Sequence, residues 1–280
     1  MILLGCCVPG ASLMPEGVAE VPKSPEAELA AKCRLILDAG FDYTECGAGM
    51  LCGLGEAGIT YLEEENEKSP LKIRAVNSMF PGNFRLLDEG EMRNTVEAHF
   101  TKMLTVMKRL RIRYAVFGSG MARSIPDGMD REEGLRRLDA FLCYMAEQAE
   151  SFGVTVVIEP LRHLETNVLN TVKESGDTVK RIHKPGMQLL CDAFHMAEEK
   201  ADIEDMTDYA GSILHCHMAE SPNRSYPGKS DSADLSYNRR FAEKLLSIGY
   251  TGGVSAECGF GDFRTDIVKT YSYMKEIFKR

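Results

Sequence analysis

Short apolar runs alternate with helical patterns along the whole chain, and this alternation limits the fold more than any other feature. Runs that resemble strands occur eight times, and most are followed by apolar residues at helical spacing. Parallel strands need crossover connections of this length, usually helices. The 280 residues match eight units of roughly 31 residues each. The sequence therefore predicts an α/β fold, a single (β/α)8 barrel formed by one domain over residues 1–280.

The expected strands and helices can be placed along the chain. One helix should begin at Ser24 and Pro25, an N-cap residue followed by a favourable first position. The segment 47–70 is rich in Gly and then in Glu, so its helix is expected to be short, irregular or displaced. A doubly wound open sheet is the alternative fold, but no GxGxxG or P-loop sequence follows any strand. The expected strands are 2–10, 41–46, 73–80, 114–118, 154–160, 187–192, 213–218 and 252–257.

Four polar residues lie at the ends of the last four expected strands. Reactive groups of (β/α)8 barrels collect at the carboxyl ends of the strands, where the following loops can vary. Three carboxylates and one imidazole at this edge would bind a divalent metal ion. An oxygen-rich set suits Mn²⁺, Mg²⁺ or Co²⁺ better than structural zinc. The predicted ligands, separated by 33, 25 and 40 residues, are Glu159, Asp192, His217 and Glu257.

Further polar residues follow these ligands at short distances in the sequence. Glu165, His195 and Arg224 could orient the ligands or bind the hydroxyl groups of a substrate. His215 should face the same interior as His217 but deeper, as a buried structural histidine. Four basic residues in the expected loops at the barrel mouth could bind a phosphate group or only contact solvent: Arg123, Arg162, Arg224 and Lys229.

Composition excludes some classes of partner and site. The chain has 33 basic and 42 acidic residues, a net charge of -9 and a pI near 5.3, which disfavours a nucleic-acid partner. No apolar run approaches the roughly 20 residues of a membrane span, and the N-terminus lacks a signal-peptide pattern. Nine cysteines without a CxxC pair indicate reduced thiols and a cytoplasmic location. Cys191, Cys216 and Cys258 neighbour predicted ligands and should face the helices.

Several blocks in the second half of the chain resemble one enzyme family. They resemble the ketose 3-epimerases, the D-tagatose 3-epimerase group, within the xylose-isomerase-like TIM-barrel superfamily of sugar isomerases and epimerases. The first half agrees only in its order of strands and helices. The blocks are IEPLRHLETN at 158–167, CDAFHM at 191–196, HCHMAESPNRSYPG at 215–228 and SAE at 255–257.

The resemblance implies a role for each matching position. Glu159 and Glu257 would exchange protons with the substrate as well as bind the metal together with Asp192 and His217. Hydroxyl groups around C1 to C3 of a sugar would be held by Glu165, His195 and Arg224.

Three departures from the family pattern concern the sugar pocket. Arg162 and His163 stand where those epimerases often have Asn-Arg, and one extra residue lies between His217 and Arg224. The first strand ends in CCVPG without the aromatic residue often found there.

The expected activity is that of a metal-dependent sugar isomerase or epimerase. It would transfer a proton next to a ketose carbonyl through an enediolate, for C3 epimerisation or for aldose–ketose isomerisation. One divalent ion, preferably Mn²⁺, is the expected cofactor, and a small sugar or sugar phosphate the expected partner. A homo-oligomer is compatible with this interpretation. Three alternatives remain: a dehydratase acting on an inosose or keto-sugar, an endonuclease IV-like DNA repair enzyme, and a non-catalytic sugar-binding protein.

Overall fold

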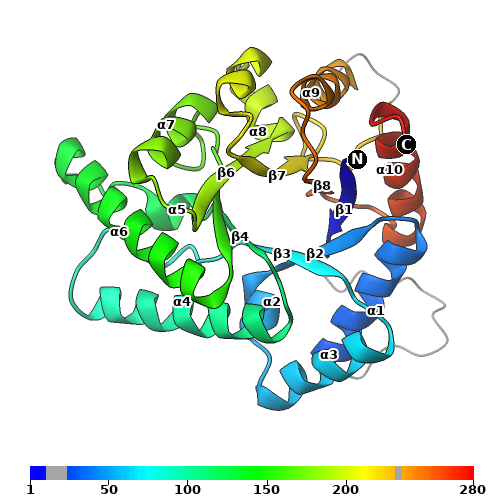
Figure 1. Cartoon of the computed structure of the whole chain (residues 1–280), viewed down its shortest axis with the longest axis horizontal. Coiled ribbons are helices and arrows are strands. Elements are labelled where there is room, and N and C mark those ends of the chain that lie inside the picture. Colours follow the sequence, from blue (N-terminus) through cyan, green and yellow to red (C-terminus); the bar gives the residue numbers. More distant parts are fainter. Residues whose placement is uncertain (11–23, 231–234) are drawn as a thin grey trace.

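The eight strands form a closed parallel barrel surrounded by helices (Figure 1). The computed structural model describes residues 1–10, 24–230 and 235–280. Each strand pairs with the next one in sequence, and β8 pairs with β1 to close the barrel. The predicted (β/α)8 fold is confirmed. The strands are β1 Leu3–Cys7, β2 Tyr43–Gly47, β3 Ile73–Asn77, β4 Tyr114–Phe117, β5 Thr155–Ile158, β6 Met187–Asp192, β7 Ile213–Met218 and β8 Gly253–Ala256.

The helices form the outer layer of the barrel (Figure 1). None of those described is long and apolar enough to cross a membrane. They are α1 Pro25–Asp38, α2 Ala48–Cys52, α3 Glu56–Lys68, α4 Glu91–Arg109, α5 Gly120–Arg123, α6 Arg131–Phe152, α7 Val172–Ile182, α8 Ala193–Glu198, the 3-10 helix η1 Ile203–Tyr209, α9 Leu235–Ser247 and α10 Phe263–Ile277.

The start of α1 agrees with the sequence prediction. The Ser24 side chain accepts a hydrogen bond from the backbone N–H of Ala27, and Pro25 occupies the first turn. Leu29, Cys33 and Ile36 are buried on the face that packs against the barrel. A capping residue followed by apolar side chains at helical spacing is sufficient to locate this helix.

The segment between β2 and β3 differs from its prediction. It contains the short helix α2 and then α3, which is a regular helix of 13 residues. The expected short, irregular or displaced helix therefore agrees with α2, which has five residues, while the regular helix α3 was not predicted. Its acidic side chains are stabilised by neighbouring helices, because Glu63 pairs with Arg109 of α4 and Glu65 pairs with Arg34 of α1. These partners come from distant parts of the sequence.

Apolar side chains form two separate layers. The large layer lies between the strands and the helices and includes Cys191 and Cys216, while Cys258 packs against it partly buried, as expected. A small second cluster inside the barrel consists of Val116, Val157 and Leu190 with Tyr114 and Leu214. Polar side chains occupy other buried positions of the strands, and among them are Tyr43, Glu45, His215, His217 and Ser255.

Candidate metal centre

The last four strands bring the four predicted ligands to one end of the barrel. Asp192 ends β6 and His217 is the penultimate residue of β7, and the two are directly paired in the sheet. Glu159 and Glu257 follow β5 and β8 immediately. The N–H of Glu257 donates to the carbonyl of Met218 at 3.1 Å, which keeps the ends of β7 and β8 level. Strand register therefore places all four side chains at the same height.

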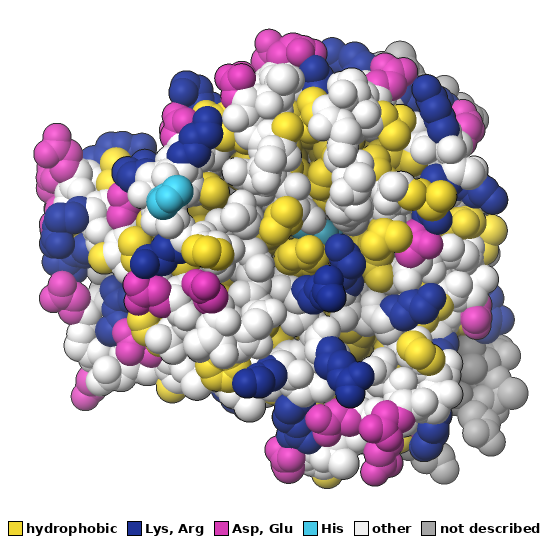
Figure 2. Space-filling view, viewed as in Figure 1, with side chains coloured by type: hydrophobic (Ala, Val, Ile, Leu, Met, Phe, Trp, Pro, Cys, Tyr) yellow, Lys and Arg dark blue, Asp and Glu magenta, His cyan; other side chains and the backbone are white. Residues whose placement is uncertain are grey.

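The ligand atoms of these four residues are close enough to share one ion. One atom from each of Glu159, Asp192, His217 and Glu257 lies within 4.8 Å of all the others. His217 Nδ1 is 3.1 Å from Glu159 Oε1 and 3.2 Å from Glu257 Oε2. Figure 2 shows a hollow near the middle of one face, with a histidine visible below hydrophobic and basic side chains.

Charge and burial in this group favour a bound cation. Burial raises the pKa of Glu159 and of Asp192. Burial also acts on Glu257, but the positive charges of His217 and Arg224 outweigh it and lower the pKa of Glu257 to about 2. Although burial opposes the charging of His217, the carboxylates around it raise the pKa of His217 well above its usual value. A positive charge is therefore stabilised among these carboxylates, and a hard divalent ion fits this set of ligands.

His195 lies beside the ligands with an unused polar atom. Its Nδ1 accepts a hydrogen bond from the N–H of Arg162 at 3.4 Å, so its hydrogen is on Nε2 in the neutral ring. Burial lowers the pKa of His195 and favours this neutral form. Nε2 is buried without a hydrogen bond in the described part of the chain, 3.5 Å from Asp192 Oδ2. It can donate to an oxygen atom of a bound molecule.

Arg224 and Glu165, the other two predicted substrate-binding residues, both make ion pairs near the centre. The Arg224 guanidinium contacts the Glu257 carboxylate and is 3.6 Å from Asp192 Oδ2. Glu165 pairs with Arg162 at 2.8 Å and lies 3.9 Å from His195 Nδ1. The structure thus brings Arg224 and His195 next to the ligands and places Glu165 behind them.

Arg123 does not lie at the mouth, so the phosphate-binding role considered for it is wrong. Its guanidinium is fully buried and donates to the carbonyl oxygens of Phe117, Glu159 and Leu169 at 2.8, 2.9 and 3.2 Å. Burial lowers the pKa of Arg123 to about 10, which leaves it charged at neutral pH. It fixes the backbone that carries Glu159.

Two residues of this region were not singled out from the sequence. Asn77, at the end of β3, donates to Glu257 Oε1 at 3.2 Å and to Cys7 Sγ at 3.3 Å. Glu45 of β2 is completely buried and contacts His217 from the side opposite the other carboxylates. The signal for Glu45 was an acid inside the strand-like run FDYTEC, where period 2 places Tyr43 and Glu45 on the same face. The expectation that His215 is buried and structural is confirmed, since it contacts Glu45 deeper in the barrel.

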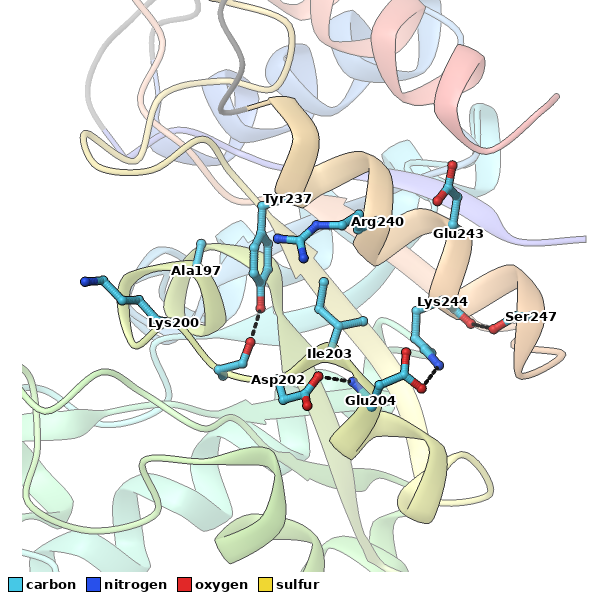
Figure 3. Close-up of a pocket in the computed structure, with 11 residues that line it drawn as sticks. Ala197, Lys200, Asp202, Ile203, Glu204, Tyr237, Arg240, Glu243, Lys244 and Ser247 are labelled. Atoms are coloured by element: carbon cyan, nitrogen blue, oxygen red, sulfur yellow. Dashed lines mark hydrogen bonds and ion pairs between the residues drawn. The ribbon is translucent and has the colours of Figure 1, made fainter.

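A large surface groove of about 770 Å³ lies away from this centre, between α8, η1 and α9 (Figure 3). Several of its polar groups already bind each other. Lys244 pairs with Glu204 at 2.6 Å, and the Tyr237 hydroxyl donates to the carbonyl of Ala201 at 3.2 Å. None of the predicted site residues lines it. The groove therefore offers no comparable chemistry.

Comparison with known families agrees with this geometry. The profile of the family described as xylose isomerase-like TIM barrel matches residues 33–274. The chain belongs to the xylose isomerase-like TIM-barrel family. The match extends over the first half of the barrel as well, where the sequence resemblance was limited to the order of elements.

Several curated relatives of this family member are named as ketose 3-epimerases, and others as isomerases. D-psicose 3-epimerase of Ruminiclostridium cellulolyticum is 28% identical over 174 residues, which cover 60% of this chain and 56% of that protein. Ketose 3-epimerase of Arthrobacter globiformis is 31% identical over 125 residues, covering 44% and 42%. D-psicose 3-epimerase of Agrobacterium fabrum is 25% identical over 227 residues, covering 78% and 75%. The chain thus spans about half the length of the first two.

Solved structures share the fold over the whole chain. A D-psicose 3-epimerase crystallised in the presence of D-fructose has a TM-score of 0.77 and 19% identity, with full coverage of both chains. A 3-keto-D-glucoside 4-epimerase from E. coli has a TM-score of 0.78 and 16% identity, covering 99% and 100%. At this identity the likeness shows the barrel fold of the family.

Proposed function

We propose that this protein is a metal-dependent ketose epimerase or isomerase that moves a proton on the carbon next to a ketose carbonyl. The observation that carries the proposal is the convergence of Glu159, Asp192, His217 and Glu257 within 4.8 Å at one end of the barrel. The first relatives are named D-psicose and ketose 3-epimerases, and this supports C3 epimerisation over the isomerisation for which two other relatives are named.

A bound metal ion would make the C–H group next to the ketose carbonyl acidic enough for a carboxylate to remove its proton. A divalent ion, for which we propose Mn²⁺, would polarise the carbonyl as a Lewis acid when bound by the four ligands. Removal of the proton on the neighbouring carbon then gives an enediolate. Positively charged groups near the developing oxyanion, such as Arg224, would favour that charge.

We infer that Glu159 and Glu257 would act as acid and base. They come from β5 and β8 and contact the same atom of His217, Nδ1, at 3.1 and 3.2 Å. A sugar bound above this point would have one carboxylate on each side. If one removes a proton from one face and the other returns a proton to the opposite face, the configuration at C3 is inverted.

Substrate hydroxyl groups would be held by residues around the centre. His195 offers a buried N–H without a protein partner in the described residues, and Arg224 offers its guanidinium beside Glu257. The third predicted residue, Glu165, holds Arg162 and would orient it toward the substrate. This division of roles extends the prediction made from the sequence.

We propose that the substrate carries no phosphate. Of the four basic residues considered for that group, Arg123 is buried inside the protein. Arg162 pairs with Glu165 and Glu198, and Arg224 pairs with Glu257. The fourth residue, Lys229, donates to the Ser225 hydroxyl at 3.3 Å and lies over the Tyr226 ring. A phosphate dianion would have to displace carboxylates from these guanidinium groups, whereas neutral hydroxyl groups would not.

Solvent exchange tests the reaction directly. The Mn²⁺-loaded protein is incubated in deuterated water with free and phosphorylated ketoses, and NMR locates the carbon that gains deuterium. We expect exchange at C3 of a free ketose and its loss, by at least 100-fold, in Glu159→Gln and Glu257→Gln. Glu276→Gln, which alters an exposed acid of α10 that pairs with Arg239 of α9, is the matched control and should retain full exchange.

Other outcomes of this experiment would contradict the proposed activity. Normal exchange in both site variants would remove the acid–base roles. Formation of an enone product would indicate a dehydratase, and metal binding without exchange on any ketose would indicate a sugar-binding protein. A cytoplasmic location and assembly into a homo-oligomer stay predictions from the sequence, and size-exclusion chromatography with light scattering tests the second.

A further inference from the structure

A buried carboxylate on β2 contacts the histidine of the metal centre from behind. Glu45 Oε1 is 2.9 Å from His217 Nε2. Its other oxygen, Oε2, is 2.8 Å from His215 Nε2 and 2.7 Å from Ser255 Oγ. Glu45, His215, His217 and Ser255 are all completely buried. Such a carboxylate would be strongly destabilising without these partners.

The direction of each hydrogen bond follows from the chemistry of the carboxylate. An ionised Glu45 only accepts, so each of its partners must donate. Ser255 therefore gives its hydrogen to Glu45, and the Tyr43 hydroxyl, at 2.9 Å from Ser255 Oγ, must donate to Ser255. For the same reason the hydrogen of His217 that points to Glu45 is on Nε2. Nδ1 is then the atom that faces Glu159 and Glu257.

We propose that Glu45 is a positioning residue that selects Nδ1 of His217 as the metal-binding atom and fixes the ring plane. This inference rests on the proposed metal centre. Histidine ligands bind through one nitrogen while the other donates to an acceptor that sets tautomer and orientation. Here the acceptor comes from β2, on the other side of the barrel from β7, and is itself fixed by His215 and Ser255.

A second metal ion is the competing interpretation of the same residues. Ligand atoms of Cys7, Glu45 and His217 also lie within 4.8 Å of one another. To bind there as well, His217 would have to lose both ring hydrogens and bridge two ions. Cys7 Sγ also already accepts a hydrogen bond from Asn77 at 3.3 Å. The arrangement favours a hydrogen bond over a second ion.

Metal binding without any sugar tests the proposal. Glu45→Gln keeps the size of the side chain but removes its charge and replaces one acceptor oxygen by a donor. Asp42→Asn is the matched control, because it makes the same change just before β2, at the opposite end of the barrel. EPR measures free and bound Mn²⁺ in titrations of each protein. We expect one ion per wild-type chain and a 10- to 100-fold weaker affinity in Glu45→Gln.

The control should bind Mn²⁺ within about threefold of wild type, which would separate positioning from a general loss of negative charge. Unchanged affinity in Glu45→Gln, or two ions per wild-type chain, would overturn the role of Glu45. No Mn²⁺ binding by the wild-type chain would instead refute the metal centre and with it the proposed function. The titration therefore distinguishes the two failures.

A second measurement on the unmodified chain reports the tautomer itself. In the Zn²⁺-loaded protein, ¹⁵N NMR of the histidine rings should show His217 with a protonated Nε2 and a metal-bound Nδ1. The reverse assignment in wild type would contradict the proposal even if Glu45→Gln did not fold. In a folded Glu45→Gln variant we expect a changed Nε2 resonance and faster exchange of its hydrogen with solvent.

Discussion

At the scale of single residues, the most unusual group is the buried guanidinium of Arg123. It binds the carbonyl oxygens of Phe117, the last residue of β4, of Glu159, the residue after β5, and of Leu169 in the loop that follows. The carbonyls of Phe117 and Leu169 also accept backbone hydrogen bonds, from the N–H groups of Glu159 and Leu161 at 3.1 and 3.2 Å, and Arg123 adds a second donor to each. Arg123 therefore joins two strand ends and a loop at the point where Glu159 enters the site.

Replacing Arg123 should destabilise the fold. In Arg123→Met the apolar stem is kept, but three buried carbonyl groups each lose one hydrogen bond from a charged donor, and we expect a loss of about 3 kcal/mol in the free energy of unfolding. Arg131→Met is the control, since Arg131 donates to the carbonyl of Asn167 from an exposed position and should cost under about 1 kcal/mol. Denaturant unfolding measures both, and equal losses would contradict the role assigned to Arg123.

At the scale of the strands, the barrel interior depends on a large side chain packed against strands that carry glycine. Tyr43 of β2 extends across the barrel toward β1 and β8 and reaches Ser255. A Cβ atom at Gly5 would lie 2.2 Å from the Tyr43 ring, and one at Gly253 would lie 2.6 Å from its hydroxyl. The two glycines leave the space that Tyr43 fills.

Adding one methyl group to β1 should therefore disturb this packing. We expect Gly5→Ala to lower the free energy of unfolding by about 1–3 kcal/mol, because Tyr43 or the strand must move. Gly49→Ala is the matched control, since a Cβ atom at Gly49 of α2 meets nothing within 4 Å and Ala favours a helix. Thermal and denaturant unfolding would contradict this account if Gly5→Ala were as stable as wild type.

At the scale of the whole molecule, the candidate metal centre concentrates acidic groups in a chain that already carries a net charge of -9. Glu159, Asp192 and Glu257 come from three separate β/α units, so an ion that binds all three also links those units. Because the ion would bind the folded chain and not the unfolded one, it should stabilise the barrel.

Mn²⁺ should therefore raise the melting temperature. At one hundred times its Kd, a ligand of the folded state adds about 2.7 kcal/mol, which corresponds to a shift of roughly 5–10 °C for a domain of this size. Differential scanning calorimetry with Mn²⁺ and with EDTA measures the shift. Asp192→Asn should lose most of it, and a shift that survives in this variant would place the ion elsewhere.

The sequence alone was sufficient to predict the barrel and the four polar side chains that meet at one end of it; their role as metal ligands stays a prediction. Parallel strands of a barrel all end at the same edge. Glu159, Asp192 and Glu257 each stand at the end of a strand-like run, so their position at this edge can be predicted without long-range information. His217 was found in the same way. These predictions depend only on the local spacing of apolar residues, which indicates strands and helices, and on the position of a residue within its own strand.

Tertiary structure alone decided the partners of those ligands. Glu45 and His217 lie 172 residues apart and meet only because the barrel closes and directs β2 and β7 side chains to a common interior. The burial of Arg123 likewise depends on α5 turning back toward β5, where the carbonyl of Glu159 lies. The exposure of a residue in such a connection depends on how the elements pack together, and the local hydrophobic pattern of the sequence carries no information about that packing.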